Sequence, residues 1–132
     1  MIVVDSSVMV AALVETDQRG DLARSALAAG GRLCAPGHFP LEVVHVVRGL
    51  AMAKKLPANV ASDAVAAFAN FAFRLIPASG PLLDRVWELR HNVTAYDAAY
   101  VAVAEQLGVP LVTGDVRLAA ADGPKCEIRV LR

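Results

Sequence analysis

The stretch of residues 94–115 joins a predicted helix to a predicted buried strand and carries a carboxylate near each end. Apolar and aromatic residues recur at helical spacing in its first half, at Tyr96, Ala99, Tyr100, Val103 and Leu107. Gly108 is placed to end this helix, and residues 109–113 form a short apolar run that suits a buried strand. Because a helix and a strand joined in this way run antiparallel, we expect Asp97 and Asp115 to return to the same edge of a sheet.

The rest of the chain repeats this alternation of short apolar runs with helical patterns. Strands are predicted at residues 2–4, 32–35, 73–76 and 127–131. Helices are predicted at residues 6–14, 19–29, 58–71 and 82–90, with a further helix that starts at Pro40 and a short one after Asp115. The alternation predicts an α/β fold with a mainly parallel central sheet. We expect residues 1–132 to form a single domain, because the chain is long enough to bury one core.

The predicted helix at residues 58–71 is unusual because it is apolar almost all round. It consists almost entirely of Ala, Val and Phe, and its polar residues are Asn59, Ser62, Asp63 and Asn70. Such a helix is either buried or covered by a partner. The whole chain shares this bias, since 56% of its residues are hydrophobic and only 20% are charged. We therefore expect a homodimer or another complex in which this helix contributes to an interface.

Charge, cysteine content and hydropathy limit the partners and the compartment. The formal net charge is zero, so the chain has no general electrostatic attraction to nucleic acid, and such a substrate would have to be held locally. Cys34 and Cys126 match no metal-binding or redox spacing, and we expect two buried free thiols in a reducing cytoplasm. No apolar run approaches the ~18 residues of a membrane span. The chain opens on Ile-Val-Val-Asp without a basic segment and a cleavage site, so we expect no export signal.

Four acidic residues are expected at one edge of the predicted sheet. Asp5 and Asp115 directly follow strands, whereas Glu42 and Asp97 lie in the first turns of helices. In a parallel sheet, helix N-termini lie at the carboxyl ends of the strands, where ligands bind. Each residue also has a purely structural explanation: Asp5 and Asp115 as helix caps, Glu42 as a partner of its helix dipole, and Asp97 in a capping box that starts at Thr94.

Convergence of the four carboxylates favours a metal site over these separate explanations. Like charges within a few ångströms raise one another's pKa and resist ionisation, so the cluster needs a cation at neutral pH. Oxygen-only ligands favour Mg²⁺ or Mn²⁺ over zinc, and such ions activate water for attack on a phosphodiester. Thr113 precedes Asp115 by two residues, and its hydroxyl is placed to orient a carboxylate or a water; an ordinary strand residue is the alternative.

Other catalytic arrangements fit the sequence less well. No Ser-His-Asp or Cys-His arrangement is visible, because His38, His45 and His91 are scattered, and we interpret them as surface or core residues. A phosphatase of the haloacid-dehalogenase type needs a second Asp two residues after the first, where this chain has Ser7. A response-regulator receiver needs a Lys after its last strand, and the three lysines lie elsewhere.

Four sequence blocks, in this order, resemble the PIN-domain ribonucleases, and the length and element order are most similar to the VapC toxins of toxin–antitoxin pairs. The blocks are residues 4–8, residues 41–43 with Arg48 beyond them, residues 95–105 and residues 111–118. The resemblance covers the whole chain and implies a PIN-like three-layer sandwich with helices on both faces of the sheet. His45 departs from the family, which often has Asn three residues after the acidic residue of the second block.

The resemblance implies that Asp5, Glu42, Asp97 and Asp115 form a metal-binding, catalytic quartet, with Thr113 in support. Asp5 and Asp97 would be the main ligands of Mg²⁺, or of Mn²⁺ as a substitute, and the other two would complete the shell and position water. The implied function is a Mg²⁺-dependent endoribonuclease toxin that a cognate VapB-like antitoxin holds inactive. Two alternatives stay open: a PIN nuclease of RNA processing without an antitoxin, and a non-catalytic PIN-like binding module. An intact quartet argues against the second, since a degenerate copy is expected to lose at least one carboxylate.

Overall fold

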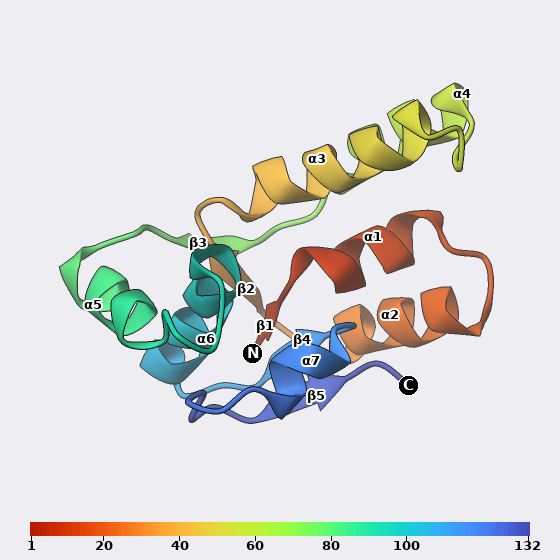
Figure 1. The fold of residues 1–132 in the computed structure, drawn as a ribbon. Coiled ribbons are helices and arrows are strands. Elements are labelled where there is room, and N and C mark those ends of the chain that lie inside the picture. The colour runs from red at the N-terminus through yellow and green to blue at the C-terminus, as the bar shows by residue number, and fades with distance from the viewer.

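The computed structural model describes all 132 residues, and its centre is a five-stranded sheet in the order β3-β2-β1-β4-β5 (Figure 1). The strands are short: β1 Ile2–Val4, β2 Leu33–Pro36, β3 Arg74–Ile76, β4 Leu111–Thr113 and β5 Ile128–Val130. In the central strand β1, Val3 lies opposite Cys34 of β2 on one side and Leu111 of β4 on the other. Every neighbouring pair is parallel, so all five strands end at the same edge of the sheet.

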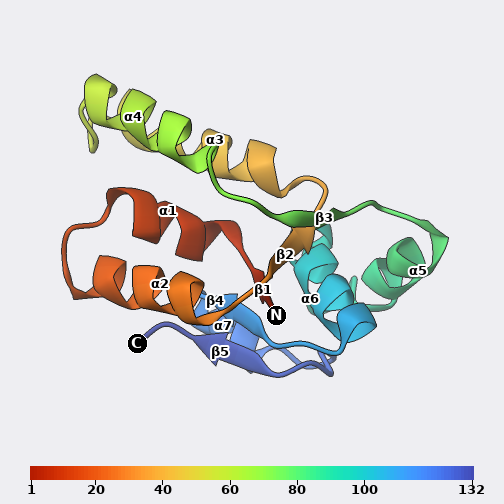
Figure 2. The same ribbon diagram turned by 180° about the vertical axis from the view of Figure 1, so that it is seen from behind.

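Seven helices connect and cover the strands. They are α1 Ser6–Val14, α2 Gln18–Ala29, α3 Phe39–Met52, α4 Ala58–Phe68, α5 Gly80–Glu88, α6 Ala95–Leu107 and α7 Val116–Ala120. Figures 1 and 2 show α5 and α6 on one side of the sheet and α1 and α2 on the other. Helix α6 packs against β1, β2 and β4, while α1 packs against β4. The predicted three-layer α/β sandwich is confirmed, with a sheet that is wholly parallel. None of the helices combines the length and apolar composition needed to cross a bilayer.

Helix α6 forms the densest part of the core and fixes one side of the candidate site. All seven of its residues from position 98 to position 104 are buried, and Tyr100 is fully enclosed among them. The helix begins at Thr94, whose hydroxyl accepts a hydrogen bond from the Asp97 amide at 3.4 Å. It ends at Gly108, which adopts the left-handed conformation (φ 65°) that glycine tolerates without strain. The predicted helix–reversal–strand unit is therefore present.

Helix α4 differs from its prediction in both length and burial. It ends at Phe68, three residues earlier than predicted, because the amides of Asn70 and Phe71 donate to carbonyls three residues back rather than four. Only Ala61 and Ala64 are buried, where the helix packs against α3 and α1. The chain itself therefore leaves most of this apolar helix exposed.

Both cysteines are free thiols, as predicted. Cys34 is fully buried within β2, whereas Cys126, just before β5, is only half-buried rather than buried. Cys34 lies on β2 and Cys126 leads into β5, and β1 and β4 lie between these two strands, so the cysteines are not paired.

Candidate functional site

Asp5 lies at the end of β1 and caps helix α1. The residue is only 8% exposed, and its carboxylate accepts hydrogen bonds from the hydroxyls of Ser7 and Thr113 and from the Val8 amide at 3.3 Å. Burial raises the pKa of Asp5, and the nearby charge of Asp97 adds to this rise, against the opposing effect of the hydrogen bonds. Both oxygens are therefore oriented by donors from α1 and β4.

Two small hydroxyl side chains connect Asp5 to the turn after β4. Ser7 accepts a hydrogen bond from the Gly114 amide at 2.9 Å, Thr113 accepts one from the Asp115 amide at 3.0 Å, and both hydroxyls donate to Asp5. A Cβ at position 114 would displace the guanidinium of Arg19 and would lie 3.1 Å from the Ser7 oxygen, so glycine allows the closest approach of this turn to Ser7. The junctions that follow β1 and β4 are thereby locked together at the carboxyl edge of the sheet.

Glu42, in the first turn of α3, is held by side chains from two other elements. Its Oε1 accepts hydrogen bonds from the Ser6 hydroxyl of α1 and from the Tyr100 hydroxyl of α6, the latter at 3.1 Å. Its Oε2 lies 3.5 Å from Nε2 of His38. Burial and the charge of Glu42 raise the pKa of Tyr100, so the phenol stays protonated and remains a donor at neutral pH.

Asp97 and Asp115 line one cavity, at the N-termini of α6 and α7. Asp97 is half-buried, and burial raises its pKa; the charges of Glu42 and Asp115 raise it further. Asp115 caps α7 by accepting a hydrogen bond from the Arg117 amide at 2.9 Å. The geometry therefore returns the two ends of the 94–115 stretch to the same edge, in agreement with the sequence pattern.

All four predicted acidic residues lie at this edge, but they do not form a closed cage of ligands. Asp97 perturbs the pKa of Asp5, and Glu42 and Asp115 perturb that of Asp97, so their charges act on one another. No three acidic, histidine or cysteine side chains, however, lie close enough together to ligate one ion directly. The four side chains therefore converge on one edge of the sheet, as predicted, but they lie farther apart than a single set of direct metal ligands would.

The donor set nevertheless fits a hard divalent cation. The four acidic side chains offer carboxylate oxygens as ligands. Mg²⁺ in proteins usually keeps several waters and needs only one or two carboxylates as direct ligands. Asp5 and Asp97 have raised pKa values because burial and neighbouring charge disfavour their ionised forms. A cation beside this pair would remove that penalty.

Four residues of this site were not predicted from the sequence: Ser6, Ser7, Tyr100 and His38. The serines are predicted only as helix caps, and Tyr100 only as part of an apolar face. Spacing offered a signal for two of them, since Tyr100 follows Asp97 by three residues and His38 precedes Glu42 by four, which places each pair one helical turn apart. The serines have no comparable signal.

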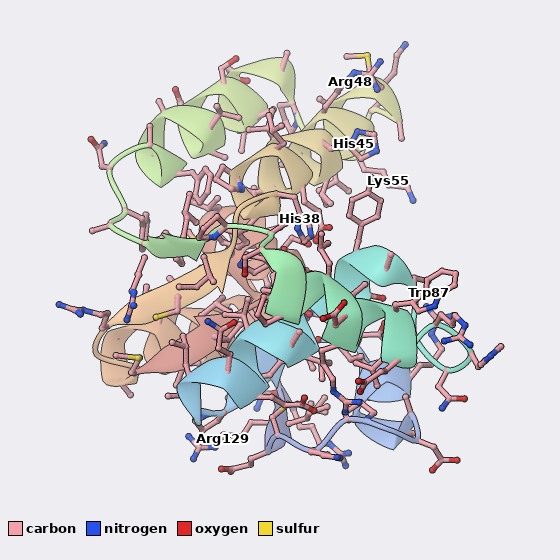
Figure 3. All side chains as sticks on the ribbon, turned by 90° about the vertical axis from the view of Figure 1, so that its left-hand side faces the viewer. His38, His45, Arg48, Lys55, Trp87 and Arg129 are labelled. Atoms are coloured by element: carbon pink, nitrogen blue, oxygen red, sulfur yellow. The ribbon has the colours of Figure 1, made fainter.

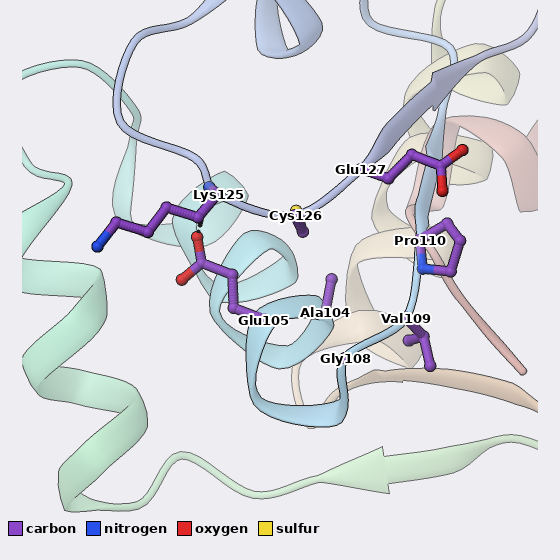
Figure 4. Close-up of a pocket in the computed structure, with 8 residues that line it drawn as sticks. All are labelled: Ala104, Glu105, Gly108, Val109, Pro110, Lys125, Cys126 and Glu127. Carbon is purple, nitrogen blue, oxygen red and sulfur yellow. Dashed lines mark hydrogen bonds between the residues drawn. The ribbon is translucent and has the colours of Figure 1, made fainter.

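A different pocket, at the opposite edge of the sheet, lacks this chemistry (Figure 4). It lies between the end of α6 and the segment that leads into β5, beside the start of β4. Its Glu105 is bound by the Arg85 guanidinium at 2.7 and 3.1 Å and by the Lys125 amide at 2.7 Å. Its Glu127 is paired with Arg129 at 2.7 Å. Both carboxylates already have cationic partners, so this pocket offers no free acidic group.

Comparison with known proteins assigns this architecture to a family. The sequence matches the PIN-domain family over residues 2–124. Ribonuclease VapC1 of Mycobacterium tuberculosis is 44% identical over 98 residues, which cover 74% of each chain. A VapC ribonuclease of Mycobacterium bovis is 40% identical over 131 residues, which cover 99% of this chain and 98% of that protein.

Solved structures share the fold at lower sequence identity. VapC20 of Mycobacterium tuberculosis, described as a toxin that cleaves the sarcin–ricin loop, has a TM-score of 0.68 and 22% identity over 91% of this chain and 94% of its own. VapBC2 of Rickettsia felis, solved with a DNA fragment from their promoter, has a TM-score of 0.70 and 15% identity, with full coverage of both chains. These likenesses concern the fold, whereas the match to the PIN-domain family spans the positions of all four acidic residues. The chain belongs to the PIN-domain family, among its VapC-type ribonucleases.

Proposed function

We propose that this protein is a Mg²⁺-dependent endoribonuclease toxin, in which Asp5, Glu42, Asp97 and Asp115 form the catalytic site. One observation carries the proposal. Glu42 caps no helix, yet its carboxylate is held by the Ser6 hydroxyl of α1 and the Tyr100 hydroxyl of α6. Helix capping accounts for the hydrogen bonds that Asp5 and Asp115 accept from backbone amides. It gives no reason for side chains of two other helices to hold Glu42.

RNA is the substrate class that the relatives favour. The relatives from Mycobacterium tuberculosis and Mycobacterium bovis are named ribonucleases, and the solved VapC20 toxin is described as cleaving the sarcin–ricin loop. The acidic edge suits hydrolysis of a phosphodiester, in which the oxygen of water is added to phosphorus and the P–O ester bond breaks. The proton of the water ends on the leaving oxygen.

Each residue of the site has a proposed role. A divalent ion bound here would supply Lewis acidity and lower the pKa of water. Asp5 and Asp97 would be the main ligands, with Mn²⁺ as a substitute for Mg²⁺, while Glu42 and Asp115 would complete the shell indirectly, through the waters that they orient. Thr113 fixes the direction of the Asp5 carboxylate through the hydrogen bond that its hydroxyl donates.

The proposal also includes partners and a location. The VapBC2 complex of Rickettsia felis supports a VapB-like antitoxin as the inhibitor of this chain. We expect a homodimer, and the exposed apolar residues of α4 are available for a contact with a second copy or with the antitoxin. Residues 1–132 act as one nuclease domain in the cytoplasm, where RNA is accessible and the two free thiols stay reduced.

Cleavage of RNA by the purified protein tests the activity. Bulk RNA incubated with protein and Mg²⁺ should be cut at discrete positions, which sequencing of the new ends would locate. Asp97→Asn should abolish the cuts, whereas Asp63→Asn, on the exposed side of α4, should leave them unchanged. Cleavage that survives Asp97→Asn would contradict the assignment of the site.

Inhibition is tested by the product of a neighbouring gene. A small protein encoded there should bind the nuclease and stop cleavage. A nuclease that is active in its host without such a partner would instead be the RNA-processing alternative.

A further inference from the structure

We propose that an apolar pocket beside the acidic edge holds an unpaired base of the RNA substrate, and that Arg48 of α3 and Lys55, just beyond the end of α3, contact flanking phosphates. This inference rests on the proposed function and adds to it a binding pocket for the base beside the bond that is cut.

The pocket lies between the β2–α3 turn, helix α5 and the start of α6. Its volume is about 330 Å³, and its walls are mainly the apolar side chains of Pro36, Ile76, Leu82, Leu83, Val86 and Ala99. An apolar cavity of roughly 150 Å³ is enough to bind benzene. The pocket therefore has room for the ring of a pyrimidine or a purine.

Two rings form the side of the pocket that faces the acidic edge. His38 and Tyr96 both line the pocket, with ring centroids 5.2 Å apart and an interplanar angle of 53°. Tyr96 is 68% exposed, so much of its ring is free for contact. Exposed aromatic rings bind single-stranded nucleic acid by stacking, with little dependence on the base. An extended apolar pocket with a free aromatic ring at its rim is suited to a stacked base.

The pocket is directly adjacent to the proposed catalytic residues. Tyr96 precedes Asp97 in the chain, and Nε2 of His38 lies 3.5 Å from Glu42. A base in the pocket would belong to a nucleotide at or next to the phosphodiester held at the acidic edge. Its occupancy would therefore position the bond that is cut.

Charge explains why the base contact is needed. Without its cation the acidic edge repels phosphates, and the formal net charge of zero gives no compensating attraction over long range. Neither Arg48 nor Lys55 forms an ion pair within the chain. Figure 3 shows Arg48 and His45 on α3, and Lys55 beyond the end of that helix, on the side of the molecule that also carries His38. The flanking phosphates thus have local cations to contact. Stacking of the base adds an attraction that does not depend on charge.

A second copy of the chain is the competing occupant of this surface. The exposed Leu83 and Trp87 of α5 lie one helical turn apart and would suit a contact between protomers. RNA is favoured because His38 of the aromatic rim lies beside Glu42 and because two cations without an ion-pair partner, Arg48 and Lys55, lie on α3 and just beyond its end. The experiment has to separate the two occupants.

Binding of a defined RNA to Asp5→Asn protein tests the pocket without cleavage. The probe is a single-stranded octaribonucleotide with one 2-aminopurine, whose fluorescence falls when the base stacks, and affinity is measured by anisotropy of an end label. Tyr96→Ala should weaken binding about tenfold or more and remove the quenching, whereas Tyr96→Phe should keep both. The same oligonucleotide in a duplex should bind more weakly, since a paired base cannot enter the pocket.

Salt dependence tests the phosphate contacts separately. Arg48→Gln should weaken binding and lower the slope of log Kd against log salt by about 0.7, the value for one phosphate contact on a single strand. Arg129→Gln removes the same charge at a position far from α3 and should change neither quantity (Figure 3). Tyr96→Ala, by contrast, should leave the slope unchanged.

Two results would overturn the inference. One is a Tyr96→Ala protein that melts like its parent and binds and quenches the oligonucleotide equally well. The other is a Tyr96→Ala protein that binds RNA normally but loses a dimer in sedimentation velocity, which would assign the pocket to a second copy. Absence of cleavage by the wild-type protein would contradict the proposed nuclease, and the binding measurements would still decide the pocket.

Discussion

Asp97 is half-buried, and its pKa is raised by burial and by the charges of Glu42 and Asp115. A raised pKa means that the folded protein binds this proton more tightly than the unfolded chain does. Stability from this group is therefore fully present below the unfolded pKa and is lost as the pH rises through the folded pKa. At neutral pH the ionised carboxylate opposes folding unless a cation accompanies it.

Replacement of Asp97 by Asn should uncouple stability from activity. In EDTA at pH 7 we expect Asp97→Asn to melt at the same temperature as the wild type or up to about 3–5 °C higher, a shift of roughly 1 kcal/mol for a domain of this size. The difference should disappear below the unfolded pKa, where Asp97 itself is neutral. Thermal melts at both pH values, beside the cleavage assay, provide the measurement. A variant that melts much earlier yet keeps its activity would show that Asp97 only supports the helix start at Thr94.

The sequence could identify the acidic residues of the site but not their partners. Asp5 and Asp115 were recognisable because each stands at the end of a short apolar run, which is a property of the local sequence. The bonds from Ser6 and Tyr100 to Glu42 span 36 and 58 residues. Such contacts depend on how α1, α3 and α6 pack in three dimensions, which periodicity does not specify.

Helices α5 and α6 are joined by a charged contact away from the site. Arg85 binds Glu105 at 2.7 and 3.1 Å, and the same guanidinium donates to the Gly123 carbonyl at 2.8 Å. Burial alone would raise the pKa of Glu105, but the hydrogen bonds from Arg85 and from the Lys125 amide outweigh it and leave the pKa lowered. Stability from this contact is therefore present above the unfolded pKa and lost as the pH falls through the folded pKa.

Glu105→Gln should destabilise the fold at neutral pH by about 2 kcal/mol, because it weakens two charge-assisted bonds and leaves Arg85 with only the more exposed Glu88 as its counter-charge. Urea unfolding at pH 7 should reveal this loss, and the difference from the wild type should shrink in acid. Glu127→Gln breaks an exposed pair with Arg129 and serves as the control, with no measurable change expected. Equal effects of the two substitutions would contradict this account of the α5–α6 contact.

Helix α4 shows where an element-level prediction depends on information outside the chain. Its composition predicts burial or a partner, and within the chain only Ala61 and Ala64 are buried. Hydrophobic content alone cannot distinguish a core helix from an interface helix, since both are apolar all round. The contacts of α4 with α1 and α3 bury only two of its residues, so α4 is not a core helix. Its role in an interface stays a prediction.

A charge on the exposed face of α4 tests that prediction. Ala66 is exposed, so Ala66→Glu should preserve the monomer fold while it weakens the homodimer or the complex with the antitoxin. Ala28→Glu places the same charge on an exposed position of α2 and is the matched control. Sedimentation velocity and antitoxin titration are the measurements. If both assemblies persist unchanged in the Ala66→Glu protein, α4 is a solvent-facing helix and no interface.

For the whole molecule, the parallel sheet and its helical layers were predictable because alternating strands and helices have few allowed arrangements. The separation of the carboxylates was not. Strand order brings them to one edge, but their distances depend on side-chain directions, and no three of them lie close enough to share an ion. A sequence pattern can therefore predict where a site forms without predicting its coordination geometry.

Inhibition by the antitoxin should be coupled to metal binding. We expect an apolar helix of the antitoxin to contact the exposed apolar surface and one of its Arg side chains to reach Asp5, Glu42 or Asp97, in competition with the cation. Raising Mg²⁺ should then weaken antitoxin binding, and the antitoxin should weaken Mg²⁺ binding by the same factor. Calorimetric titrations at several Mg²⁺ concentrations measure both. An affinity that does not vary with Mg²⁺ would confine inhibition to the apolar contact.

The rate of RNA cleavage as a function of free divalent cation tests the central claim most directly. After EDTA treatment the protein should have no activity, and Mg²⁺ or Mn²⁺ should restore it, whereas Zn²⁺ should do so poorly because the ligands are hard carboxylate oxygens. Asp97→Asn should remain inactive at every concentration. Full cleavage by the wild-type protein in excess chelator would show that the acidic edge is not a metal-dependent catalytic site.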